Sequence, residues 1–135
     1  MTNELSLPPP ACLAMIICDH IWQDPATGKR TILGTFNELC SPTFPAIHLN
    51  LAIYVSLTEA SGTMSFRTRI VDVNDERAPV FEANETLKFP GPQAVMDFDI
   101  KIETLEFPEP GDYRIQLFVG GEFITERKMM VHHVS

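Results

Sequence analysis

Apolar and polar residues alternate along most of the chain with a period of two, as expected for β-strands that have one buried and one solvated face. The clearest alternation covers residues 48–58. Its apolar positions, which we expect to face the core, are Leu49, Leu51, Ile53, Val55 and Leu57. Similar patterns predict strands at 11–22, 31–39, 63–73, 80–89 and 94–103. Since no stretch carries a helical period, the pattern predicts an all-β protein.

The C-terminal segment narrows the fold further. A Pro110-Gly111 corner precedes a strand that begins near Tyr113, and Gly120-Gly121 reverses the chain into a last strand. A tyrosine just after such a corner is typical of the tyrosine corner of immunoglobulin-like domains, in which its hydroxyl bonds to nearby backbone. We therefore predict an immunoglobulin-like antiparallel β-sandwich of about eight strands.

The Gly-Gly turn also predicts which residues face each other in this hairpin. A two-residue turn places Phe118 opposite Phe123 on the outer face, and Leu117 opposite Ile124 on the inner face. The inward alternation then slips, which predicts a β-bulge near residues 126–128. Two outward phenylalanines lower solubility unless something covers them. Phe118 and Phe123 are therefore the expected interaction surface, for a protein partner or for a second copy in a homodimer.

Length and charge restrict the organisation and the partners. With 135 residues, the chain fits one domain. We expect residues 1–10 to form a flexible N-terminal segment and residues 11–135 to form the β-sandwich. The formal net charge of −8 disfavours nucleic acid and anionic membranes as partners. The apolar run at 11–17 is too short to span a membrane and lacks the flanks of a signal peptide, so we expect a cytoplasmic protein.

The three cysteines agree with that compartment. On one strand, Cys12 and Cys18 would lie about 20 Å apart, too far for a disulfide. Cys40 could reach only one of them, which would leave one thiol over. We expect free, buried thiols.

Two groups of residues could bind a metal. The segment Asp72–Phe81 resembles the calcium-binding linker of cadherins, and Asp72, Asn74, Asp75 and Glu76 are the candidate ligands. Glu76 departs from that motif, one extra residue separates it from Pro79, and the other acidic cadherin motifs are absent. Asn and Asp also form turns between strands, and this interpretation is favoured. Cys18 and His20 would share a strand face, but their spacing matches no zinc motif.

No sequence motif of a catalytic site or of a cofactor site is present. The chain lacks the Gly-x-Ser-x-Gly and His-Glu-x-x-His patterns and any phosphate-binding glycine loop. Asp97 and Asp99 share a strand face, but beside Lys101 and Glu103 they are interpreted as a solvated row. We expect no cofactor, and a small hydrolase or transferase is the least favoured function.

Several segments resemble a pattern found in small bacterial proteins of unknown function. They are residues 14–20, Thr27-Gly28-Lys29, residues 33–36, Phe44-Pro45 and residues 111–114. The resemblance implies a single β-sandwich domain and a bacterial origin, and it implies no activity or ligand. The sequence therefore favours a non-catalytic protein-binding or self-assembly module, with a calcium-binding domain as the alternative.

Overall fold

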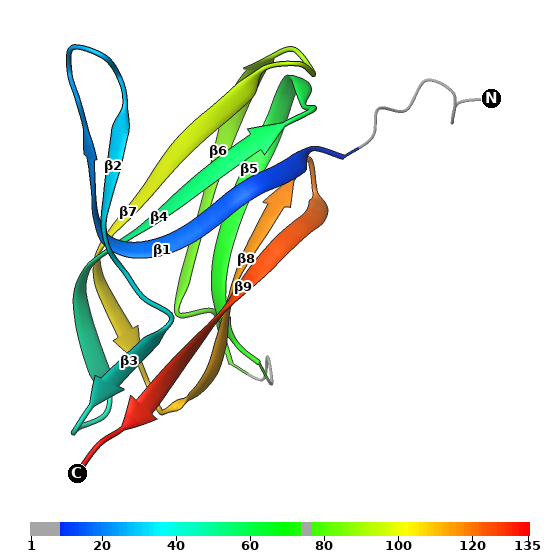
Figure 1. Ribbon diagram of the computed structural model, residues 1–135. Coiled ribbons are helices and arrows are strands. Elements are labelled where there is room, and N and C mark those ends of the chain that lie inside the picture. The colour runs from blue at the N-terminus through cyan, green and yellow to red at the C-terminus, as the bar shows by residue number, and fades with distance from the viewer. Residues whose placement is uncertain (1–8, 74–76) are drawn as a thin grey trace.

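The computed structural model describes residues 9–73 and 77–135, and this part of the chain contains β-strands and no helix (Figure 1). The strands are β1 (Ala11–Gln23), β2 (Arg30–Thr35), β3 (Glu38–Ser41), β4 (Ala46–Thr58), β5 (Ser61–Asp72), β6 (Phe81–Pro90), β7 (Val95–Phe107), β8 (Gly111–Val119) and β9 (Glu122–His133). Among the described residues, therefore, no helix could cross a membrane.

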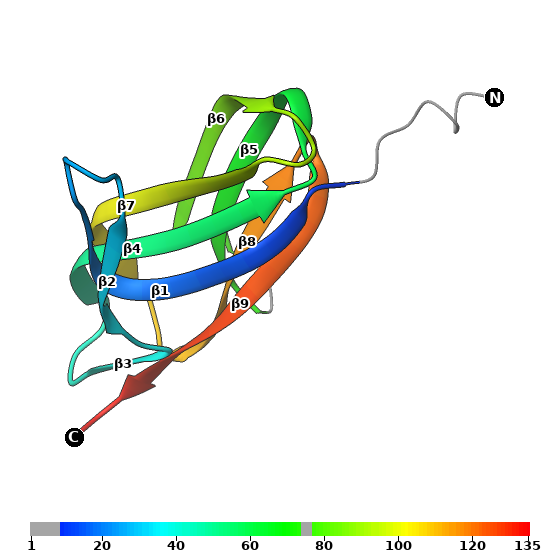
Figure 2. The ribbon, with the colours of Figure 1, turned by 45° about the horizontal axis from the view of Figure 1, so that its top comes forward.

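The strands form two packed sheets, which Figure 2 shows from a second side. One sheet has the order β2-β1-β4-β7 and the other the order β3-β9-β8-β5-β6. All neighbours are antiparallel except β3 and β9, which are parallel. The prediction of an all-β, immunoglobulin-like sandwich is confirmed. The segment expected as one strand at 31–39 divides into β2 and β3, because the chain passes from one sheet to the other there.

The tyrosine corner is present as predicted. Tyr113 is fully buried at the start of β8, and its hydroxyl donates a hydrogen bond of 2.6 Å to the backbone oxygen of Glu109. Its ring packs edge-on against Phe107, with the ring centroids 5.0 Å apart. The corner thus fixes the connection between β7 in one sheet and β8 in the other.

The inward alternation of β4 is interrupted near its start, contrary to expectation. Leu51 is buried, but Leu49 is 61% exposed, so Leu49 points away from the core. The cause is Asn50, whose φ of 61° lies in the left-handed region and reverses the side on which the next residues project. His48 takes the inner position instead, with its ring 5.5 Å from that of Phe36.

The bulge in the closing hairpin lies closer to the turn than predicted. Leu117 pairs with Thr125 and not with Ile124, and the register shifts at this point. Ile124 is therefore the extra residue, and the prediction of a bulge at 126–128 was wrong. Beyond Ile124 the alternation of β9 is regular.

Candidate interaction surface

The outer face of the five-stranded sheet carries the predicted aromatic pair beside the β8–β9 turn. Gly120 and Gly121 both have positive φ, as a two-residue type I′ turn requires, and this turn places Phe118 opposite Phe123. The two ring centroids are 5.7 Å apart in an edge-to-face arrangement, and Phe123 remains 52% exposed. The guanidinium carbon of Arg67 lies 5.3 Å from the centroid of the Phe118 ring. Aromatic residues and arginine are enriched at the centres of protein interfaces.

A network of ion pairs continues along the same face. Arg114 donates hydrogen bonds of 2.9 and 3.0 Å to the carboxylate of Asp112 and one of 2.9 Å to Glu126. Gln116 also donates to Glu126, and Lys128 lies 3.8 Å from Asp112. The hydrogen bonds from Arg114 lower the pKa of Asp112, and its two carboxylate partners raise the pKa of Arg114. Both groups are therefore charged at neutral pH.

The two sheets differ in the charge of their outer faces. On the five-stranded sheet, the ion pairs join four basic residues to three acidic ones, namely Arg67, Arg69, Arg114 and Lys128 with Glu82, Asp112 and Glu126. Strand β7 of the other sheet carries Asp97, Asp99, Lys101, Glu103 and Glu106. In a chain with a net charge of −8, the face around Phe118 is thus the less acidic one.

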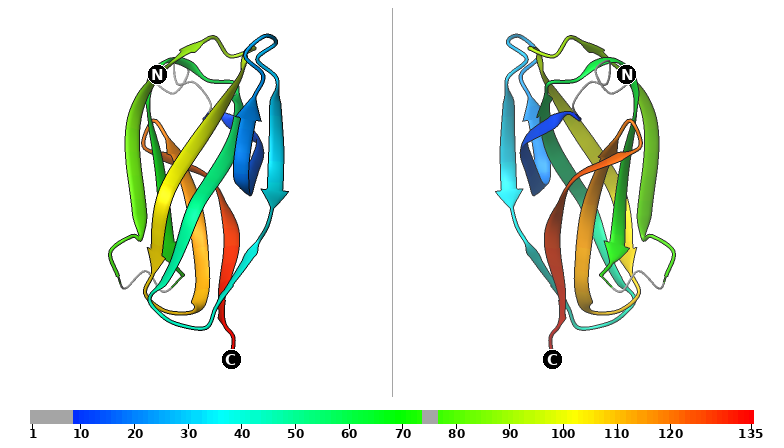
Figure 3. Two further views of the ribbon diagram at one scale, coloured as in Figure 1. Left: turned by 90° about the vertical axis from the view of Figure 1, so that its left-hand side faces the viewer. Right: turned by 90° about the vertical axis from the view of Figure 1, so that its right-hand side faces the viewer.

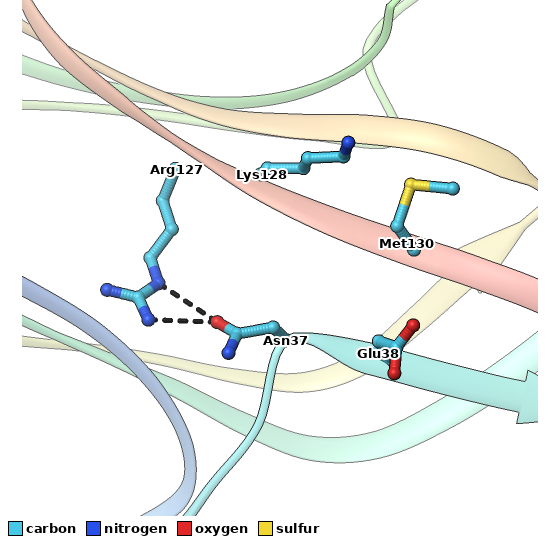
Figure 4. A pocket seen from close by; sticks show the side chains of 5 residues that line it. All are labelled: Asn37, Glu38, Arg127, Lys128 and Met130. Carbon is cyan, nitrogen blue, oxygen red and sulfur yellow. Dashed lines mark hydrogen bonds between the residues drawn. The ribbon is translucent and has the colours of Figure 1, made fainter.

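A pocket of about 500 Å³ adjoins this face where β9 meets β3 (Figure 4). Its lining residues are Asn37, Glu38, Arg127, Lys128 and Met130. One wall is rigid, because Arg127 donates hydrogen bonds of 2.8 and 3.3 Å to Asn37 Oδ1 and one of 2.6 Å to the backbone oxygen of Met15. Arg127 therefore connects β9 to β1 across the two sheets, and this use is structural.

The apolar pattern of the sequence did not indicate the role of Arg127. It pairs with the fully buried Ile115, so it occupies an inward position of β9. Its side chain extends out of the core at the side of the sandwich. There it donates a hydrogen bond to a backbone oxygen on the part of the β1 edge that β2 does not cover. A basic residue two positions before the inward Met129 was the available signal.

A second polar cluster, also missed, lies on the four-stranded sheet beneath the β1–β2 hairpin. Arg30 donates a hydrogen bond of 2.7 Å to Asp99 and lies 3.8 Å from Asp97. The hydroxyl of Tyr54 donates to Asp97 at 3.0 Å. Burial, and then this hydrogen bond, raise the pKa of Tyr54. Asp97 and Asp99 are therefore not the solvated row that the sequence predicted, since Arg30 and Tyr54 bind them and hold the hairpin over the sheet.

Only one of the four predicted calcium ligands lies in the part of the chain that the structure describes. Asp72 ends β5, whereas Asn74, Asp75 and Glu76 lie outside the described residues. In the described ranges, no three His, Cys, Asp or Glu side chains form a group that could hold a metal ion. The calcium hypothesis therefore stays a prediction.

The three cysteines are free, as predicted, but they are not all buried. Cys18 is buried against Ala52, whereas His20, two residues further along the same unbroken pairing with β2, is exposed. Burial raises the pKa of the Cys12 and Cys18 thiols. Cys40 is exposed because it takes an outward position on the short edge strand β3.

Comparison with known proteins identifies the family. A family model described as "Family of unknown function (DUF6941)" matches residues 13–132. The chain belongs to this family. The DUF6941 match extends from Leu13 in β1 to His132 in β9 and so includes every strand of the described residues at least in part.

A comparison of the DUF6941 chain with curated proteins finds no match. Among solved structures, it is similar to "The structure of a beta-glucuronidase from glycoside hydrolase family 2", with 12% sequence identity and a TM-score of 0.44. The likeness covers 67% of this chain and only 12% of that one.

Proposed function

We propose that this DUF6941 domain is a non-catalytic protein-binding module that self-associates through the outer face of its five-stranded sheet. The observation that supports the proposal is the Phe118–Phe123 pair on the outer face, in which Phe123 is exposed and Phe118 is half-buried beneath Arg67. Bacterial origin, supported by the resemblance of residues 14–20 and 33–36, is part of the same proposal. So is a cytoplasmic location, which the free cysteines support.

The charges indicate the face at which a second copy of the chain meets the least repulsion. Two copies with a net charge of −8 repel each other, and they approach at least cost where basic side chains balance the acidic ones. The mixed-sign network around Arg114 meets this condition. A two-fold axis through such a face can place arginines of one copy beside carboxylates of the other while the phenylalanines meet.

The test is the solution mass by light scattering across a concentration series, with Phe123→Glu as the variant. Leu33→Glu is the matched control, because Leu33 is 49% exposed on the other sheet and the substitution changes the net charge equally. We expect a concentration-dependent dimer for the wild type and for Leu33→Glu, and a monomer for Phe123→Glu. A wild-type protein that is monomeric at every concentration would rule out self-association.

The calcium alternative is separated by a different measurement. If residues 72–76 bind calcium, the melting temperature rises with added calcium and falls with a chelator. We expect neither change, because a turn is the favoured interpretation of these residues.

A further inference from the structure

Strand β7 is an edge strand with an open side. It pairs with β4 alone, and among the described residues no other strand lies on its second edge (Figure 3). From Val95 to Ile102 the pairing with β4 is regular, without a register shift. A long, regular edge is a ready site for another strand, because its unpaired N–H and C=O groups can form a new ladder.

The neighbouring edge strand β6 has two protective features that β7 lacks. In β6, Glu85 pairs in register with the buried Phe66, so a charged residue occupies an inward position. Pro90 ends the strand. Inward charges and prolines are devices that prevent association at sheet edges. In β7 the inward residues from Met96 to Ile102 are all apolar, and the strand contains no proline.

The edge of β7 also leaves apolar surface for an incoming strand to cover. Met96 and Phe98 pack against the core but stay partly exposed. Phe98 contacts Phe89 of β6 at 6.1 Å between ring centroids, so β6 and β7 border the same side of the sandwich. A strand added to β7 would place alternate apolar side chains beside Met96 and Phe98, near the carboxylate-bearing Glu85.

The outward charges of β7 decide between partners. In antiparallel self-pairing, a centre at residue 98 or 101 brings only like charges together, and a centre at residue 100 gives equal numbers of like and opposite pairs. A centre at residue 99 makes Asp99 face its own copy between two Asp97–Lys101 pairs. A strand with basic outward residues avoids this repulsion and is attracted chiefly by the exposed Glu103, because Arg30 already pairs with Asp97 and Asp99. We propose that the open edge of β7 binds an extended segment of another protein that alternates apolar and basic side chains, by β-strand addition. This surface lies on the sheet that does not carry Phe118 and Phe123, so the inference stands apart from the proposed self-association.

The probe is a capped octapeptide, (Lys-Val)₄, with (Glu-Val)₄ as the charge-reversed control. Binding is followed by fluorescence anisotropy, and the site by amide hydrogen exchange. We expect saturable binding of (Lys-Val)₄ alone, with added protection of amides between Val95 and Ile102. Equal binding of both peptides, or protection elsewhere without protection of β7, would overturn the proposal.

Two variants of β7 test the mechanism. Met96→Lys introduces the inward charge that β7 lacks and should weaken peptide binding by about tenfold or more, whereas Met96→Leu should leave it unchanged. Glu103→Lys, at an exposed position, should weaken binding by about threefold. Its control is Glu122→Lys, which changes the net charge equally but lies on the β8–β9 hairpin. Wild-type affinity in both Met96→Lys and Glu103→Lys would contradict strand addition at β7.

These variants also separate the two proposals. Phe123→Glu should abolish the dimer and leave peptide binding intact. Met96→Lys should leave the dimer intact and weaken peptide binding. Loss of both properties in Phe123→Glu would refute the assignment of the peptide to the β7 edge.

Discussion

Replacing Arg127 by alanine should destabilise the domain without affecting the outer face of the sheet. The substitution removes the hydrogen bond to the Met15 oxygen and the two to Asn37. A hydrogen bond from a charged donor contributes about 1.5–3 kcal/mol, and the value here lies near the lower limit because water can replace part of it. With a smaller contribution from the exposed Asn37 contact, we expect a loss of about 2–3 kcal/mol.

Thermal unfolding followed by circular dichroism converts this loss into a temperature. An unfolding entropy of about 2.1 cal/mol/K per residue amounts to about 0.28 kcal/mol/K for 135 residues. The melting temperature of Arg127→Ala should therefore fall by about 7–11 °C. Arg127→Lys keeps one charged donor but not the planar fork, so its melting temperature should fall by about half as much. A melting temperature of Arg127→Ala within about 1 °C of the wild type would show that the connection between β9 and β1 contributes nothing.

Other substitutions test the backbone and the tyrosine corner. Gly34→Ala places a Cβ 2.6 Å from Asp19 Oδ2 at a φ of +72°, whereas Gly62→Ala meets no atom within 4 Å at a φ of +80°. In urea denaturation we expect losses of about 2 kcal/mol and about 1 kcal/mol, and equal losses would exclude a role for the Asp19 contact. Tyr113→Phe removes the hydrogen bond to Glu109 and should cost about 1 kcal/mol at pH 7. Because burial raises the pKa of Tyr113, the neutral phenol stabilises the fold below about pH 10, and this contribution is lost as the pH rises through the folded-state pKa. Above pH 10 the free energy of unfolding should fall less for Tyr113→Phe than for the wild type. If the difference in stability between the two proteins is the same below and above pH 10, this reasoning is contradicted.

Local features of the sequence predicted the closing hairpin well. The Gly120-Gly121 turn fixes which residues face each other within two positions, so the Phe118–Phe123 pair followed directly. The tyrosine corner also depends on a few neighbouring residues. The bulge at Ile124 was predicted at the wrong position. The prediction assumed that inward residues of β9 are apolar, whereas Arg127 occupies one of these inward positions.

Features that depend on distant contacts could not be predicted. Asn50 tolerates left-handed backbone, but nothing near it in sequence reveals that it adopts this conformation and turns Leu49 outward. The Arg30–Asp99 ion pair joins residues 69 positions apart and depends on how the β1–β2 hairpin folds over the sheet. The openness of the β7 edge likewise follows from the strand order and not from its residues.

The acidic charge of the chain affects the two proposed surfaces in opposite directions. Self-association brings together two bodies with a net charge of −8, so added salt screens their repulsion and should strengthen the dimer. Binding of a basic strand to β7 depends on attraction by Glu103 and by the overall charge, so the same salt should weaken it. The Debye length falls from about 30 Å at 0.01 M to about 8 Å at 0.15 M ionic strength, and over this range both effects should change steeply. If both surfaces act in one protein, low ionic strength therefore favours a peptide-bound monomer, and higher ionic strength favours the free dimer.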